Sequence, residues 1–204
     1  MQLVFVGRNY ADHAKEMGNA VPKEPLLFLK PPSSIIKSGE AIVLHPVSSH
    51  IEFEGEIGLV LGGRLHRANE VEARAVLSHI VAINDVSARD LQKSDGQWAR
   101  AKGLDTFCPL GDPAPAPADL SAITLVTTVN GVECQRAQAS DMVFSIPTLL
   151  AYISQYITLQ AGDIVATGTP AGTRKLSPGD IVTVELSDGS GLLSRVSNPV
   201  VAGT

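Results

Sequence analysis

Three glutamates occupy alternate positions at the start of an apolar segment: Glu52, Glu54 and Glu56. In an extended strand, residues two apart point to the same face, so this spacing places three carboxylates side by side. Crowded carboxylates lose hydration and repel one another, so a buried arrangement needs protons or a cation. A solvated strand face is the alternative, but residues 57–61, which follow, are typical of a protein interior. The sharper interpretation is a metal site with oxygen ligands, completed by one more acid.

Asp85 is a candidate for that further acid, because it follows a second apolar segment at residues 79–83. Residues that bind something are often found where a buried strand leaves the core, although a lone aspartate there can also cap the next turn. Together with the glutamates, Asp85 would give hard oxygen ligands without a thiolate. Such a ligand set favours Mg²⁺, or else Mn²⁺ or Ca²⁺, over Zn²⁺.

Two cations near Asp85 in the sequence bear on the substrate. Three carboxylates with a divalent cation leave a charge of about −1, which does not attract an anionic ligand unless cations help. Arg89 and Lys102 are the candidates, since an arginine fits a carboxylate as a fork and a lysine acts as a point charge. Either residue could instead lie on the surface.

A short helix is predicted over residues 9–18, with Asn9 as its N-cap and Gly18 as its C′ residue. His13 and Glu16 are three apart and would share one face of this helix. Taken alone, the pair favours an exposed helix contact over a catalytic dyad. A helix of two turns is marginal in isolation, so we expect it to order over something beneath it.

The elements that must position these residues are mostly short strands. Helices are predicted from the capping box at Asn69 to about Ser78, and from Ser145 to Ile157. Strands are predicted at residues 1–8, within 22–32, as a pair within 35–44, at 57–61, 79–83 and 123–129, and after the glycines at 162 and 179. A hairpin is predicted at Asn130-Gly131. Many short strands and few helices indicate a β-rich mixed fold.

Length and composition favour one medium-sized domain. The chain has 204 residues, of which 44% are hydrophobic and 18% charged. A net charge of −5 without a basic stripe argues against nucleic acid as a partner, and no apolar run is long enough to cross a membrane. The first eight residues are typical of a strand and not of a signal peptide. Cys108 and Cys134 form no disulfide framework, so we expect both to be buried fillers in a cytoplasmic protein.

Several segments together resemble the acylpyruvate hydrolase and oxaloacetate decarboxylase-like branch of the fumarylacetoacetate hydrolase family. The match runs from about Val6 almost to the C-terminus. It is carried by Gly7-Arg8-Asn9-Tyr10-Ala11-Asp12-His13-Ala14-Lys15-Glu16-Met17, Leu27-Phe28-Leu29-Lys30-Pro31, Glu54-Gly55-Glu56, Asn84-Asp85-Val86-Ser87-Ala88-Arg89-Asp90-Leu91-Gln92, Trp98-Ala99-Arg100-Ala101-Lys102 and Thr167-Gly168-Thr169-Pro170-Ala171-Gly172. Each segment alone is a weak signal, whereas the set is specific.

The resemblance implies a role for each matching position. Glu54, Glu56 and Asp85 correspond to the metal ligands, whereas Glu52 is expected at the rim of the site. His13 and Glu16 correspond to a dyad on a lid helix, which acts with Lys102 in catalysis. The substrate's oxo-acid end is expected to be held by three residues, Arg89, Gln92 and Thr169.

The resemblance also implies the architecture: a β-rich α+β fold, namely a roll with a mixed β-barrel core, in a protein that is usually a homodimer. Residues 1–204 would form one catalytic domain, with the N-terminal strands and the lid helix in residues 1–45 and the β-rich core in residues 46–204. One departure is visible. The family often has Ser-Phe after the lysine, where this chain has Gly103-Leu104, and this departure leaves the pocket wall and the substrate preference open.

The resemblance implies a metal-dependent hydrolase that acts on carbon–carbon bonds in ketonic substances. Its substrate would be an acylpyruvate, such as fumarylpyruvate or acetylpyruvate, cleaved to pyruvate and a carboxylic acid. Decarboxylation of oxaloacetate is a rival, because it produces the same enolate without hydrolytic water. Isomerisation or decarboxylation of a dicarboxylic 2-oxo acid in aromatic catabolism is another. A non-catalytic module that binds a metal and a carboxylate is the remaining alternative.

Overall fold

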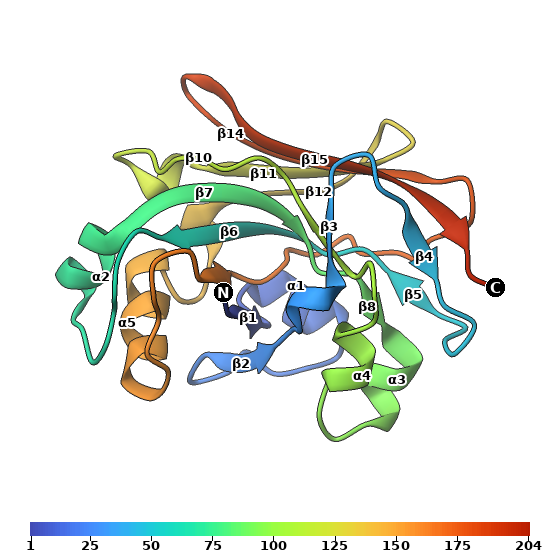
Figure 1. Ribbon diagram of the computed structural model, residues 1–204, viewed down its shortest axis with the longest axis horizontal. Coiled ribbons are helices and arrows are strands. Elements are labelled where there is room, and N and C mark those ends of the chain that lie inside the picture. Colours follow the sequence, from blue (N-terminus) through green and yellow to red (C-terminus); the bar gives the residue numbers. More distant parts are fainter.

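The computed structural model describes residues 1–204, and its framework is a strongly curved mixed sheet of eight strands (Figure 1). Three of the pairings in the molecule, β1 with β13, β3 with β9 and β15 with β4, are parallel, and the other ladders are antiparallel. The strands of the large sheet are, in spatial order, β2 (Leu26–Leu29), β1 (Leu3–Gly7), β13 (Ile164–Ala166), β6 (Gly55–Leu61), β7 (Leu77–Asn84), β9 (Cys108–Leu110) and β3 (Ile35–Lys37), with β10 (Ala114–Pro115) beside β7.

A second sheet of five strands lies across the large one in Figure 1. Its centre is the long β14–β15 hairpin, and its order is β12 (Val132–Gln138), β11 (Thr124–Val129), β14 (Ile181–Asp188), β15 (Gly191–Ala202) and β4 (Ile42–Leu44). A short two-stranded ladder joins β5 (Ile51–Glu52) to β8 (Ser87–Ala88). The β-rich, mixed α+β roll that the sequence predicts is therefore confirmed, as a curled half-barrel sheet.

Five α-helices decorate the sheets: α1 (Ala11–Glu16), α2 (Glu70–Val76), α3 (Arg89–Ser94), α4 (Ala99–Lys102) and α5 (Ile146–Tyr156). Three single turns of 3₁₀-helix are η1 (Pro32–Ser34), η2 (Leu120–Ala122) and η3 (Ala139–Asp141). Figure 1 shows α2 beside α5 at one end of the molecule and α3 beside α4 at the other. None of these helices is both long and apolar enough to span a bilayer.

The main hydrophobic core fills the space between the two sheets and extends to α5. It includes Ile57 and Leu59 of β6, Leu125 of β11 and Val184 of β14, all of them fully buried. Because side chains alternate along β6, the opposite face of that strand is free to carry a different chemistry. That face is where Glu56 lies.

Several local predictions are confirmed. The capping box at Asn69 is present, and α2 ends at Val76, two residues before the predicted end. The hairpin at Asn130-Gly131 joins β11 to β12, and Ser145 caps α5. The predicted strand pair within residues 35–44 is wrong as a pair. Its strands β3 and β4 exist, but each joins a different sheet, because each finds a partner more than 70 residues away in the chain.

The predicted N-cap of the first helix is also wrong. Tyr10 occupies that position, and the amide of Asn9 instead bonds distant backbone. Its Nδ2 donates to the carbonyls of Thr167 and Phe144, and its Oδ1 accepts from the Phe144 amide. Gly18 does adopt a left-handed conformation, with φ of 69°, after the last turn of α1. Asn9 therefore clamps the end of β1 to two other segments and does not cap α1.

Candidate metal and substrate site

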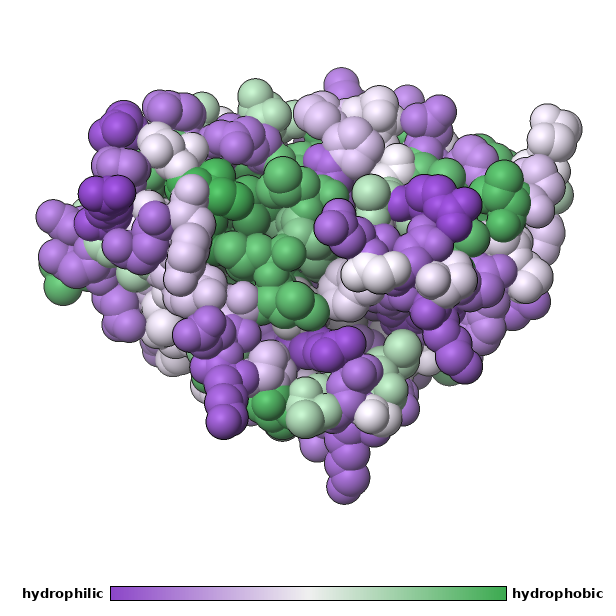
Figure 2. Space-filling model, turned by 90° about the horizontal axis from the view of Figure 1, so that it is seen from below, coloured by the Kyte–Doolittle hydropathy of each residue, from purple (hydrophilic) through white to green (hydrophobic).

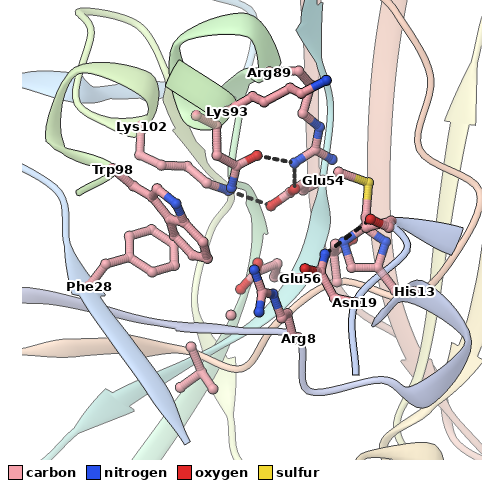
Figure 3. A pocket seen from close by; sticks show the side chains of 15 residues that line it. Arg8, His13, Asn19, Phe28, Glu54, Glu56, Arg89, Lys93, Trp98 and Lys102 are labelled. Atoms are coloured by element: carbon pink, nitrogen blue, oxygen red, sulfur yellow. Dashed lines mark hydrogen bonds and ion pairs between the residues drawn. The ribbon is translucent and has the colours of Figure 1, made fainter. Parts of the chain in front are cut away.

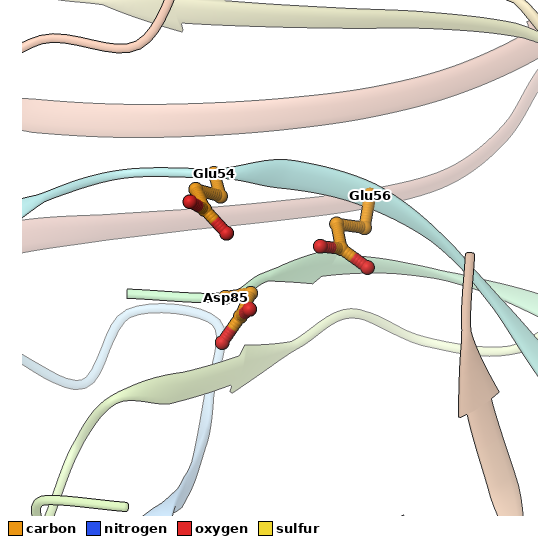
Figure 4. A group of neighbouring side chains, drawn as sticks. All are labelled: Glu54, Glu56 and Asp85. Atoms are coloured by element: carbon orange, nitrogen blue, oxygen red, sulfur yellow. The ribbon is translucent and has the colours of Figure 1, made fainter. Parts of the chain in front are cut away.

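Three buried carboxylates meet where β6 begins and β7 ends (Figure 4). One ligand oxygen from each of Glu54, Glu56 and Asp85 lies within 4.8 Å of the others. The antiparallel register of β6 with β7 sets Gly55 opposite Asn84, which brings Glu54 and Asp85 together. Two hydrogen bonds fix this corner: the Asp85 amide donates to the Glu54 carbonyl at 2.8 Å, and the Glu54 amide donates to Asn84 Oδ1 at 3.0 Å.

The glycine between the two glutamates is required by packing on the other face of the strand. A Cβ added to Gly55 would lie 1.9 Å from Thr127 Oγ1 of β11. The backbone of β6 can approach β11 this closely only without a side chain at residue 55. One constraint therefore explains both the spacing of the two acids and the glycine between them. One face of the strand carries the acids, and the other face packs tightly against β11.

Two lysines come from other segments to meet these acids, and both are fully buried. Lys102 Nζ lies 2.6 Å from Glu54 Oε2 and 2.5 Å from Asp85 Oδ2. Lys30 Nζ lies 2.5 Å from Asp85 Oδ1 and also donates to the carbonyls of Val86 and Phe107. Asp85 is thus held from both sides by ammonium groups.

The surroundings of the site shift the pKa values of Glu54 and Glu56 in opposite directions. Burial opposes ionisation of Glu54, but Arg89 and Lys102 outweigh it and hold its pKa below the usual value. Burial, Asp85 and Glu54 raise the pKa of Glu56 well above the usual value. Glu56 forms no ion pair, and its Oε2 accepts a hydrogen bond from the Gly168 amide at 2.8 Å. The cluster therefore lacks positive charge at Glu56.

The residues present fit a divalent cation. The donors are hard oxygens from three buried carboxylates, and a cation among them would supply the charge that Glu56 lacks. The sequence-based prediction that these three acids lie close together is confirmed. It was wrong to place all three glutamates on one strand face, because β5 ends at Glu52 and β6 begins at Gly55. Glu52 bonds Arg89 and Thr173 at the rim and takes no part in the cluster.

Arg89 connects the rim to the acid cluster. Its Nε donates to Glu52 Oε2 at 2.7 Å, while its Nη1 lies 2.5 Å from Glu54 Oε1 and 2.8 Å from Gln92 Oε1. Arg89 opens α3, and Gln92 follows one turn later, so both side chains face the site. The arrangement leaves a guanidinium and a carboxamide beside the metal ligands, where they can hold the polar end of a small acid.

His13 and Glu16 lie on α1 above the same space. His13 is buried, and its Nδ1 lies 3.3 Å from Glu16 Oε2. Glu16 in turn accepts hydrogen bonds from the Gly172 amide at 3.2 Å, which ties α1 to the loop after β13. Thr169 of that loop is buried and is fixed by a hydrogen bond from Gln135 Nε2. The dyad is thus oriented by a second segment.

Most of the predicted site residues line one cavity of about 490 Å³ (Figure 3), whereas Glu16 and Asp85 do not. Of the predicted site residues, His13, Glu54, Glu56, Arg89, Gln92, Lys102 and Thr169 all line it. Neither residue of the Gly103-Leu104 departure does. Leu104 packs against the smaller core around Phe53, and a Cβ on Gly103 would lie 2.6 Å from the Ala99 carbonyl oxygen. The pair therefore lies outside the wall of this cavity.

This geometry can be compared with known proteins. The family model described as fumarylacetoacetate (FAA) hydrolase C-terminal matches residues 2–201. The chain belongs to the fumarylacetoacetate hydrolase family. It is therefore a member of an enzyme family whose enzymes generally use a divalent metal, and the acid cluster is where this chain can bind one.

Named relatives in the fumarylacetoacetate hydrolase family differ in activity. The chain is 40% identical over 196 residues to the mitochondrial oxaloacetate tautomerase of Caenorhabditis elegans, covering 92% of this chain and 90% of the relative. It is 36% identical over 191 residues to the mitochondrial oxaloacetate decarboxylase of Dictyostelium discoideum, covering 89% and 86%. The crystal structure of 5-carboxymethyl-2-hydroxymuconate delta-isomerase from Mycobacterium smegmatis superposes with a TM-score of 0.90, at 39% identity, and covers 100% of this chain and 79% of that one.

Sequence reasoning missed several residues that complete the site. Lys30, Asn84 and Gln135 each bond a site residue, and none was assigned a role. Lys30 stands in the quoted segment before Pro31, but a lysine after an apolar strand predicts an exposed side chain. Charge balance gave no signal for Lys30 either, since a divalent cation with Arg89 and Lys102 already neutralises three acids.

Proposed function

We propose that the protein is a metal-dependent enzyme acting on 2-oxo acids, and that its main reaction converts oxaloacetate through an enolate. The reaction is either keto–enol tautomerisation or loss of carbon dioxide. The observation that carries this proposal is the convergence of Glu54, Glu56 and Asp85 with Lys102 beside a cavity, which all of them except Asp85 line. Relatives named for both reactions support it.

Glu54, Glu56 and Asp85 would hold the cation, for which we propose Mg²⁺, with Mn²⁺ or Ca²⁺ as alternatives. A divalent cation bound there supplies a Lewis acid that stabilises negative charge on the 2-oxo oxygen of the substrate. Arg89, Gln92 and Thr169 would hold the adjacent carboxylate. That carboxylate then has a guanidinium fork on one side and a fixed loop on the other.

Lys102 would add a second positive charge where the enolate forms. Its ammonium group already contacts two of the metal ligands, so it need not move to reach the reacting end of the substrate. In decarboxylation the C3–C4 bond breaks, its electron pair remains as the enolate, and C3 later takes a proton. His13, oriented by Glu16, is the group placed to carry that proton.

Hydrolysis of an acylpyruvate is the second candidate, and the His13–Glu16 dyad favours it. Because Nδ1 of His13 faces Glu16, its Nε2 remains to accept a proton from a water molecule that attacks the distal carbonyl. Lys102 would stabilise the same enolate as the leaving group. Pyruvate and a carboxylic acid would be released.

An assay with oxaloacetate, acetylpyruvate and fumarylpyruvate side by side tests both candidates. We expect turnover of oxaloacetate with Mg²⁺, no turnover after exhaustive chelation, and recovery when Mg²⁺ is restored. Faster cleavage of an acylpyruvate than of oxaloacetate would reverse the order of the two candidates. Full activity in the chelated protein would reject the metal-dependent proposal.

His13→Ala tests the role of the dyad. We expect turnover to fall by at least about 100-fold while Mg²⁺ affinity stays unchanged, because general acid–base catalysis contributes that much and His13 is not a metal ligand. His66→Ala is the matched control, since His66 is exposed and lies outside the cavity. Undiminished turnover in His13→Ala would remove His13 from the mechanism.

A further inference from the structure

Arg8 carries a charge in the cavity that no residue of the chain neutralises. It is half-buried, it lines the cavity, and it forms no ion pair or side-chain hydrogen bond. Its guanidinium lies over the Trp98 ring, 5.8 Å from the centroid. The other inward cations are already occupied, Arg89 by Glu52 and Glu54 and Lys102 by Glu54 and Asp85. Arg8 can therefore give its full charge to a ligand.

The backbone at Arg8 is held in a conformation that costs energy. Its φ is 60°, in the left-handed region that a residue with a side chain rarely adopts. The flanking residues enforce it. Asn9 is clamped to Thr167 and Phe144, and a Cβ on Gly7 would lie 2.9 Å from Trp98. The end of β1 thus aims one arginine into the cavity, and strain of this kind is often found at functional positions.

The position of Arg8 complements that of Arg89. Figure 3 shows the two guanidinium groups on opposite sides of Glu54. A small 2-oxo acid whose carboxylate end lies by Arg89 and Gln92 would extend across the acid cluster, so its far end would approach Arg8. An arginine at the far end of the cavity can select a dicarboxylic acid by pairing with its second carboxylate.

We propose that Arg8 binds the second carboxylate of the substrate and makes the enzyme specific for dicarboxylic 2-oxo acids. This inference rests on the proposed function, since it assumes that the first carboxylate lies at the metal end. A planar guanidinium pairs with a carboxylate through two parallel hydrogen bonds, which an apolar acyl group cannot form. An acylpyruvate with an uncharged tail would leave Arg8 desolvated and unpaired.

Two other features of the cavity suggest different occupants for its far end. The rings of Phe28 and Trp98 pack edge to face with their centroids 5.2 Å apart. They form an aromatic wall of the cavity, which suits an apolar acyl group. Lys93 also lines the cavity without an ion-pair partner, but its side chain is exposed and strongly hydrated. Each alternative predicts a different result in the experiment below.

Trp98 is the only tryptophan of the chain and lines the cavity, so its fluorescence reports binding there. Three probes are titrated with Mg²⁺ present: oxalate, which fills the metal end alone, 2-oxoglutarate, and 2-oxovalerate, which replaces the distal carboxylate with a methyl group. The variants are Arg8→Gln, Arg8→Lys and the control Lys93→Gln. Oxaloacetate turnover gives kcat and KM for each variant.

We expect Arg8→Gln to weaken 2-oxoglutarate binding about 10- to 100-fold, as the loss of a charged hydrogen-bonded pair predicts. The affinities of Arg8→Gln for oxalate and 2-oxovalerate should change by less than about twofold. Arg8→Lys should retain part of the affinity for 2-oxoglutarate that Arg8→Gln loses. For oxaloacetate we expect KM to rise, because its second carboxylate is the group that Arg8 binds. Decarboxylation releases that same carboxylate as carbon dioxide, so the selective readout is the binding of 2-oxoglutarate and not kcat.

Four outcomes would overturn the inference. They are unchanged 2-oxoglutarate binding in Arg8→Gln, an equal loss for all three probes, a loss that follows Lys93→Gln instead, and tighter binding of 2-oxovalerate than of 2-oxoglutarate by the unaltered chain. The first three would show that Arg8 does not select the substrate. The last would show that Phe28 and Trp98 favour an apolar group at the far end of the cavity. If oxalate gives no Mg²⁺-dependent signal in the unaltered chain, the proposed function itself fails.

Discussion

At the scale of single residues, Lys30 shows how the site keeps three acids buried together. Its ammonium group has no exposed surface and makes three contacts, to Asp85 and to the carbonyls of Val86 and Phe107. A buried charge is tolerated only when it is paired and fully hydrogen-bonded, and Lys30 satisfies both conditions for itself and for one oxygen of Asp85. Lys30 positions Asp85, and it is not among the residues that line the cavity.

Lys30→Met should therefore lower the free energy of unfolding by about 3–5 kcal/mol, because it leaves a buried carboxylate short of a partner. Urea denaturation measures the change. Lys37→Met is the control, since Lys37 is exposed and its side chain contacts no acid, and its effect should stay within about 0.5 kcal/mol. Equal stability of the two variants would show that Asp85 does not depend on Lys30.

The two cysteines differ in environment, contrary to the expectation that both are buried. Cys108 is fully buried in β9, and burial raises its pKa to about 12. Cys134 lies in β12, an edge strand of the second sheet, and is only half-buried. The expectation was wrong for Cys134, which packs against the core around Phe53 but stays partly exposed, because the cover over an edge strand cannot be recognised from the residue type.

A thiol reagent such as dithionitrobenzoate should therefore label one cysteine of the folded chain, since only an accessible thiolate reacts. We expect Cys134→Ser to abolish this reaction and Cys108→Ser to leave it intact. Labelling of both thiols should require denaturant. Two reactive thiols in the native protein would contradict the burial of Cys108.

At the scale of elements, the important feature is the clamp that Asn9 forms at the end of β1. Its side chain bonds Thr167 beside β13 and Phe144 before α5, so one amide joins three segments that are distant in sequence. Arg8 and α1 stand on either side of this clamp. The placement of the dyad therefore depends on tertiary hydrogen bonds, because α1 has only six residues and no side-chain cap.

Asn9→Ala should destabilise the fold by about 2–4 kcal/mol, because it leaves buried backbone groups without partners. It should also slow turnover by loosening α1. Urea denaturation and kinetics report the two effects separately. Asn19→Ala provides the comparison, since that side chain makes a single exposed bond to the Met17 carbonyl. A stability change as small as that of Asn19→Ala would refute the clamp.

Local spacing is what made the acid cluster predictable. Glu54 and Glu56 are two apart on one strand, and Asp85 follows an apolar strand, so all three could be recognised from the sequence. Lys30 and Gln135 could not, because they reach the site from segments whose own patterns indicate only exposed polar residues. The predicted pairing within residues 35–44 was wrong for a similar reason, because the partner of a strand depends on packing across the whole sheet. The short polar helices α3 and α4 carry no apolar periodicity and were not predicted at all.

At the scale of the whole molecule, one surface has the features of a protein–protein interface. β2 ends the large sheet and runs along the lower side of the molecule in Figure 1, where it exposes Leu29 at 56%. The same side, seen from below, carries a group of hydrophobic residues near its middle (Figure 2). An exposed apolar edge strand favours pairing with another chain. We propose that this surface lies in a homodimer.

Light scattering should then give twice the chain mass for the unaltered protein. Leu29→Lys should shift the mass toward that of one chain, because it places a charge in the contact. Val132→Lys is the control, since Val132 is 59% exposed on an edge strand of the other sheet. A monomeric unaltered protein, or an effect of Val132→Lys alone, would exclude this surface.

The parallel pairing of β1 with β13 has a consequence for how the chain is made. Leu3 lies beside Ile164, so β1, which can pair early with β2, waits for its other partner until about 160 residues later in synthesis. Until then its apolar residues, and the arginine and lid helix that follow it, have no final place. A nascent chain that stalls before residue 164 should therefore need a chaperone to shield this segment, and it should acquire activity only when β13 emerges.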